Sequence, residues 1–66
     1  MNIILNNATN SVPNNITIEE LLLLNNIKNK YIAVEINKKI IPKSEYKECQ
    51  LFEGDRIEII TAIGGG

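Results

Sequence analysis

Apolar and polar positions along this 66-residue chain alternate with a period of two in residues 31–37, form short apolar runs in other segments and follow a helical spacing in one. Alternation predicts strands with two unlike faces, and helical spacing predicts an amphipathic helix. The segments that we expect to be strands are 2–6, 9–12, 31–37, 40–41 and 56–63. The first two should form a hairpin through the polar break at Asn6 and Asn7, because asparagine tolerates the left-handed backbone of a tight turn.

A single helix is expected from Ile18 to about Leu24. Thr17 can act as its N-cap, and Glu20 three residues later can return the hydrogen bond, which is the capping-box pattern. At 100° per residue, three apolar side chains share the face that should be buried: Ile18, Leu21 and Leu22. Leu23 lies nearly opposite, so we expect it to be exposed.

Between the middle strands and the last one the pattern is less regular. Pro42 cannot donate a ladder hydrogen bond, so the strand before it should be very short and lie at an edge. Ser44 is expected to cap a brief helical turn, and Gly54 is available for a positive φ in the turn before the last strand. Four further side chains are expected to pack in the core: Tyr31, Tyr46, Leu51 and Phe52.

The last strand is apolar on both faces, since Ile57, Ile59 and Ile60 cannot all point the same way. Such a strand is typical of the centre of a sheet, and beside the first strand it would run parallel. The order of elements is β-β-α-β-β-turn-β, which predicts an α+β fold of the ubiquitin-like β-grasp type, with one helix covering a mixed four- to five-stranded sheet. We expect residues 1–63 to form this domain and residues 64–66 to form a flexible tail.

The tail Gly64-Gly65-Gly66 has no side chains to pack and can adopt almost any backbone conformation. Fully extended, three residues reach roughly 10 Å and can enter a slot too narrow for other residues. The α-carboxylate of such a tail can be presented to the active site of another protein. The simpler interpretation is an ordinary frayed terminus, which is the default for domain ends.

Composition narrows the possible functions. Seven basic and eight acidic residues give a formal charge of −1, which argues against a nucleic acid as the partner. The chain has no histidine, no cluster of metal ligands and a single cysteine, Cys49, so we expect no catalytic residue and no metal site. No signal-peptide pattern and no apolar run of membrane-spanning length is present, which favours the cytoplasm.

Four segments together resemble the ThiS family, the ubiquitin-like sulfur carrier proteins of thiamin biosynthesis: 3–7, 17–22, 34–46 and 51–59 before the glycine tail. The third and fourth segments are fairly specific in combination, whereas a diglycine alone is a weak signal. Two features depart from the common pattern of the family. The tail carries a third glycine, as in some members, and Lys43 stands where arginine is common.

The resemblance implies that the chain is a protein cosubstrate and not an enzyme. In the family, a ThiF-type adenylating enzyme uses ATP to join the terminal glycine to AMP. Sulfur from a cysteine desulfurase or related donor then converts the adenylate to a thiocarboxylate, which donates sulfur on thiazole synthase (ThiG). Carried over to this sequence, Gly66 is the modified residue, and Ile63, Gly64 and Gly65 contact the partner enzymes. The chain itself is expected to bind no cofactor.

Two other functions are compatible with the pattern. The small subunit of molybdopterin synthase resembles this chain in fold and tail chemistry, but it is usually longer and approaches its diglycine through proline, whereas here the approach is Thr61-Ala62-Ile63. A passive β-grasp interaction module would instead bind through its sheet face. For such a module, deletion of the tail would be harmless.

Overall fold

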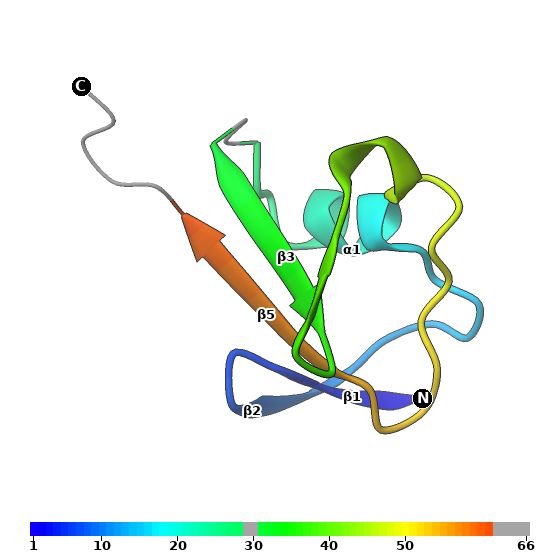
Figure 1. Cartoon of the computed structure of the whole chain (residues 1–66). Coiled ribbons are helices and arrows are strands. Elements are labelled where there is room, and N and C mark those ends of the chain that lie inside the picture. Colours follow the sequence, from blue (N-terminus) through cyan, green and yellow to red (C-terminus); the bar gives the residue numbers. More distant parts are fainter. Residues whose placement is uncertain (29–30, 62–66) are drawn as a thin grey trace.

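The computed structural model describes residues 1–28 and 31–61 of the chain. Its elements, in chain order, are β1 (Asn2–Leu5), β2 (Ala8–Ser11), α1 (Ile18–Leu24), β3 (Ile32–Ile36), β4 (Lys39–Ile41), the short 3-10 helix η1 (Lys43–Glu45) and β5 (Arg56–Thr61). The strands form one five-stranded sheet in the order β2-β1-β5-β3-β4, and α1 packs against one side of it (Figure 1). The expected α+β fold is confirmed.

The last strand in the sequence is the central strand of the sheet, as its two apolar faces predict. β5 runs parallel to β1 and antiparallel to β3, whereas β1 with β2 and β3 with β4 form antiparallel hairpins. Both hairpins turn through two residues with positive φ, which is the backbone that matches the twist of the flanking strands. These residues are Asn6 and Asn7 in the first hairpin and Asn37 and Lys38 in the second.

The capping box holds the start of α1. The Thr17 side chain accepts the Glu20 N–H at 3.2 Å, and the Glu20 carboxylate accepts the Thr17 N–H at 2.9 Å. The segment that precedes β5 fixes the same end, because Ile18 N–H donates to the Cys49 carbonyl at 3.0 Å. Asn26, with φ of 56°, lies just beyond the C-cap of the helix. The helix therefore has the bounds that its capping signals predict.

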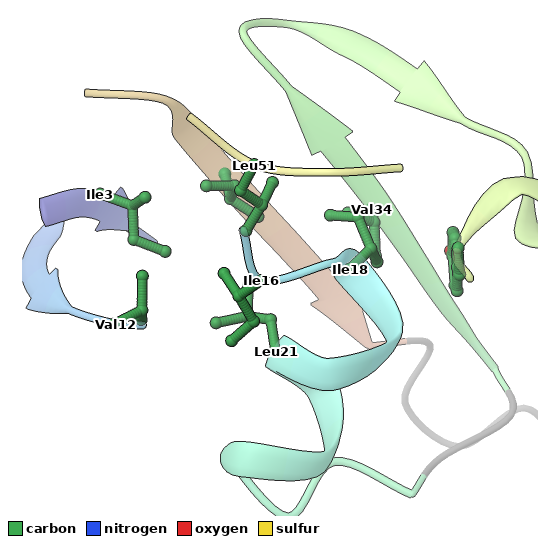
Figure 2. Close-up of a cluster of buried hydrophobic side chains, with 9 residues drawn as sticks. Ile3, Val12, Ile16, Ile18, Leu21, Val34 and Leu51 are labelled. Atoms are coloured by element: carbon green, nitrogen blue, oxygen red, sulfur yellow. The ribbon is translucent and has the colours of Figure 1, made fainter. Parts of the chain in front are cut away.

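The core lies between α1 and the facing side of the sheet, where side chains of α1, β1, β3, β5 and several connecting segments meet (Figure 2). Its fully buried members include Ile18 and Leu21 of the helix and Ile57 of β5. The complete buried set is Ile3, Val12, Ile16, Ile18, Leu21, Val34, Tyr46, Leu51 and Ile57. Leu22 is only half-buried, and Leu23 is exposed, as the helical spacing predicts.

Three predictions from the sequence are wrong. Phe52 is 63% exposed because Leu51 takes the inward position and Phe52 begins the turn that Asp55 closes. Tyr31 precedes β3 and is also exposed, so only Tyr46 of the two tyrosines packs in the core. Ser44 does not cap the short helix, which follows Pro42 without a side-chain cap.

Candidate functional site: the strand that carries the glycine tail

The strand that leads to the glycine tail is paired on both sides within the sheet. The whole of β3 pairs with β5, from Ile36 opposite Ile57 to Ile32 opposite Thr61. On the other side, β1 pairs with the first part of β5. Thr61 is the last residue of β5 that the structure describes. The predicted site residues Ile63, Gly64, Gly65 and Gly66 lie outside the described residues.

An asparagine from the second hairpin fixes the beginning of β5. The Asn37 side-chain oxygen accepts the Arg56 N–H at 3.0 Å, and its amide nitrogen donates to the Asp55 carboxylate at 3.2 Å. The Asn37 backbone N–H also donates to the Arg56 carbonyl at 2.8 Å. Asn37 has φ of 51°, so one residue both makes the tight turn after β3 and anchors the neighbouring strand.

A second asparagine, Asn6 in the β1–β2 hairpin, also forms hydrogen bonds to β5. β1 ends at Leu5, but the Asn6 backbone N–H still donates to the Ile57 carbonyl at 2.9 Å. The Asn6 side-chain oxygen then accepts the Ile59 N–H at 2.8 Å. The side-chain oxygen therefore takes the place of the Asn6 backbone carbonyl, which would accept this N–H in a continued parallel ladder. Asn6 was predicted as a turn residue and Asn37 as the end of the strand 31–37, and the contacts of both with β5 are missing from those predictions.

The side of the sheet that faces away from α1 carries two exposed isoleucines, Ile40 (67% exposed) and Ile60 (50%). We call this side the outer face and define it by the outward-pointing residues Ala33, Glu35, Ile40, Glu58 and Ile60. Large apolar side chains gathered on an exposed surface mark sites of protein association. The outer face includes β5, so it is continuous with the approach to the tail.

Two glutamates face each other in the middle of the outer face. Glu35 of β3 lies directly opposite Glu58 of β5, and both side chains are half-buried. Neither carboxylate forms an ion pair or hydrogen bond with another residue that the structure describes. Like charges in directly opposite positions destabilise a sheet.

The lone cysteine is placed poorly for nucleophilic chemistry. Burial raises the pKa of the Cys49 thiol, and the negative charges of Glu45 and Asp55 raise it further. The thiolate is the reactive form, so this environment lowers the reactivity of Cys49 at neutral pH. Within residues 1–28 and 31–61 there is no group of side chains that would hold a metal ion. The same residues contain no helix long and apolar enough to cross a membrane.

The helix across a mixed sheet, with a parallel pair formed by the first and last strands, defines a ubiquitin-like β-grasp protein. The chain belongs to the ThiS family, because residues 3–66 match the model of that family. It is therefore a sulfur carrier protein of thiamin biosynthesis, as the resemblance in its sequence implies.

Individual relatives agree with this assignment. The sulfur carrier protein ThiS of Bacillus subtilis is 46% identical over 50 residues, which cover 76% of each chain. The crystal structure of the thiamine biosynthesis protein ThiS from Geobacter metallireducens is similar over 100% of both chains, with a TM-score of 0.87 and 25% identity. A thiazole synthase of Paramagnetospirillum magneticum is 35% identical over 66 residues; the chain spans only 20% of the length of that relative.

Proposed function

We propose that the chain carries sulfur as a thiocarboxylate formed on the α-carboxyl group of Gly66. The observation that carries this proposal is the family match, which extends through residue 66. The firmly held β5 supports it, because a tail attached to a fixed strand leaves the domain from a defined point. In this proposal partner enzymes bind the folded domain, and the tail, residues 64–66, carries the carboxyl group that reacts.

The chemistry requires activation of the carboxyl group. An α-carboxylate has a pKa of about 3.3–3.7 and is anionic at neutral pH, so it resists nucleophilic attack. Attack of the carboxylate oxygen on the α-phosphorus of ATP releases pyrophosphate and leaves an acyl-adenylate. A persulfide from the sulfur donor then displaces AMP from the carbonyl carbon to give an acyl disulfide, and attack of a thiol on the outer sulfur releases the thiocarboxylate and forms a disulfide with the donor. ATP is a substrate of the adenylating partner, and the chain binds no cofactor of its own in this scheme.

Delivery of the carboxylate is the contribution of this chain. From Thr61 to Gly66 the fully extended backbone reaches about 17 Å, at roughly 3.3–3.6 Å per residue. Docking of the domain therefore confines the carboxylate to a small volume near the partner's active site. Confinement of this kind converts a bimolecular encounter into a local reaction. The absence of side chains at Gly64 and Gly65 lets the tail pass through a narrow channel.

The docking surface that we propose consists of the outer face and the strand leading to the tail, with Ile63 included. Ile40 and Ile60 supply exposed apolar anchors, and interfaces usually depend on a few such anchors with a less important surround. The Glu35–Glu58 pair at the centre of this face favours a partner surface that contributes a positive charge there. Docking on this side leaves α1 uncovered.

The partners in this proposal are a ThiF-type adenylating enzyme, thiazole synthase (ThiG) and, indirectly, a cysteine desulfurase or related sulfur donor. The Paramagnetospirillum relative supports the second of these, because a protein named thiazole synthase there contains a segment similar to this whole chain. A partner held within the same polypeptide has a high effective concentration. We place the reaction in the cytoplasm, where ATP is available.

The test is the intact mass of the chain after incubation with ATP and a ThiF-type enzyme, and then with a sulfur donor. We expect an acyl-adenylate first, and then the mass change of one oxygen replaced by sulfur, located in the tail peptide. Deletion of Gly65 and Gly66 should abolish both without unfolding the domain. The matched control Cys49→Ser should be modified like the unaltered chain. Sulfur loading of the tail-deleted chain, or a persulfide on Cys49, would contradict the proposal.

A further inference from the structure

The two sides of β5 are paired to different lengths. On the β3 side the pairing continues to Ile32 opposite Thr61. On the β1 side it stops at Leu5 opposite Ile57, and the Asn6 side chain adds one more bond, to the Ile59 N–H. Figure 1 shows the arrowhead of β5 extending past the β1–β2 hairpin, with no strand beside it on that side. The last part of β5 is therefore an edge within an otherwise central strand.

The hydrogen-bond register identifies the backbone groups at this edge. The carbonyls of Asp55 and Ile57 accept bonds from the β1 side, and the Ile59 N–H is directed to the same side. Backbone groups of alternate residues point the same way, so the Ile59 carbonyl and the Thr61 N–H also face this side. Neither group is bonded to any residue that the structure describes. Thr61 is exposed, so a strand can approach the edge.

One partner residue can satisfy both groups. In a parallel pair, a residue donates to the carbonyl before its counterpart and accepts from the N–H after it. Ile4 already donates in this way to the Asp55 carbonyl, opposite Arg56. A strand in line with β1, placed opposite Ile60, would repeat the arrangement with the Ile59 carbonyl and the Thr61 N–H. The vacant position is thus shaped for a strand parallel to β5.

We propose that an extended segment of the adenylating enzyme pairs with this edge, continuing the ladder that β1 begins. Addition of a strand to an exposed edge is an established mode of recognition, in which main-chain bonds supply affinity. The occupant follows from proximity, because the edge lies within about 17 Å of extended chain from Gly66. The adenylating enzyme is the partner that binds the free carboxylate, so it can reach the edge while the tail is in its active site. This inference rests on the proposed function.

The variant Thr61→Pro tests the pairing, because it removes the N–H that faces the vacant edge and leaves the β3 ladder its donors. Proline is tolerated in strands where the N–H faces away from the ladder. Thr61→Val is the matched control, since it keeps the N–H and the β-branched shape. With the ThiF-type enzyme and ATP, we expect kcat/KM for pyrophosphate release to fall about tenfold for Thr61→Pro relative to Thr61→Val, the factor of one lost hydrogen bond.

Hydrogen exchange on the unaltered chain provides a test that needs no variant. The Thr61 amide should exchange rapidly in the free chain and become protected in the complex with the adenylating enzyme. The inference would be overturned if Thr61→Pro and Thr61→Val had equal kcat/KM for pyrophosphate release. It would also be overturned if the Thr61 amide gained no protection from exchange at saturating enzyme. Protection that rises with the concentration of the chain alone would overturn it too, because it would assign the edge to a second copy. Failure of the unaltered chain to form an adenylate would instead contradict the proposed function.

Discussion

The Asn6 side-chain oxygen accepts the Ile59 backbone N–H at 2.8 Å, although the two residues are 53 positions apart in the sequence. Because Asn6 also has φ of 48°, it makes the turn of the first hairpin at the same time. One side chain therefore couples the opening hairpin to the strand that carries the tail.

Asn6→Gly separates these two roles, because glycine keeps the left-handed turn but lacks the acceptor. We expect it to lower the free energy of unfolding by about 1 kcal/mol, the net value of one hydrogen bond, and to speed exchange of the Ile59 amide. Asn7→Gly is the matched control. Asn7 has φ of 70° and makes no bond to the backbone of β5, so its replacement should leave Ile59 exchange unchanged. Urea denaturation and amide exchange measure both effects, and equal behaviour of the two variants would contradict the role of Asn6.

Replacement of one member of the acidic pair should stabilise the domain. Glu58→Gln removes the repulsion with Glu35 across the strands, and we expect a gain of about 0.2–1 kcal/mol in the free energy of unfolding at low salt. The gain should shrink as salt screens the charges of the unaltered chain. Glu48→Gln is a suitable control, since Glu48 is exposed and lies outside the sheet. A Glu58→Gln effect that equals the control at every salt concentration would show that the two carboxylates do not interact.

The stability of the domain should fall at alkaline pH. The folded chain raises the pKa of the Cys49 thiol above its ordinary value of 9.0, chiefly by burial. The folded state thus holds this proton more tightly than the unfolded state, so the contribution is complete below pH 9 and is lost as the pH rises through the raised pKa. Burial also raises the pKa of Tyr46, which extends the loss to higher pH. Urea midpoints between pH 7 and 10 should decline, and less steeply for Cys49→Ser; a midpoint that rises over this range would contradict the sign.

The proposed docking surface can be tested without altering the glycine tail. Ile63→Asp should weaken adenylation by the ThiF-type enzyme, raising KM, while the urea midpoint stays close to that of the unaltered chain. Ile60→Asp should act in the same direction, because Ile60 is half exposed on the outer face. Leu23→Asp, on the exposed side of α1, is the control and should be adenylated normally. If all three variants are activated alike, docking uses another surface.

Features that depend on neighbours in the sequence could be predicted. The capping box needs only Thr17 and Glu20 on adjacent turns, and the central position of β5 follows from its isoleucines on both faces. The glycine tail is likewise a local pattern, but the chemistry expected of it is implied only by the resemblance of four separate segments to the ThiS family. Phe52 was predicted wrongly because apolar character alone does not show which of two adjacent residues points inward.

Features that depend on register could not be predicted in the same way. The opposition of Glu35 and Glu58 exists only once β3 and β5 have paired in one of several possible alignments. The vacant edge beside Thr61 arises because β1 is shorter than β5 and ends at a turn. Sequence patterns mark where strands occur, whereas the site is formed by how far each strand extends along its neighbour.

The position of β5 between β1 and β3 has a consequence for synthesis on the ribosome. A nascent chain that has not yet emerged as far as Arg56 lacks the strand that joins its two hairpins, so each hairpin keeps an open edge. A prematurely terminated product of that length would be unfolded and open to proteolysis, and would not persist as a folded competitor without a tail. The domain therefore folds only after translation has passed Arg56 and reached the end of β5, next to the glycine tail.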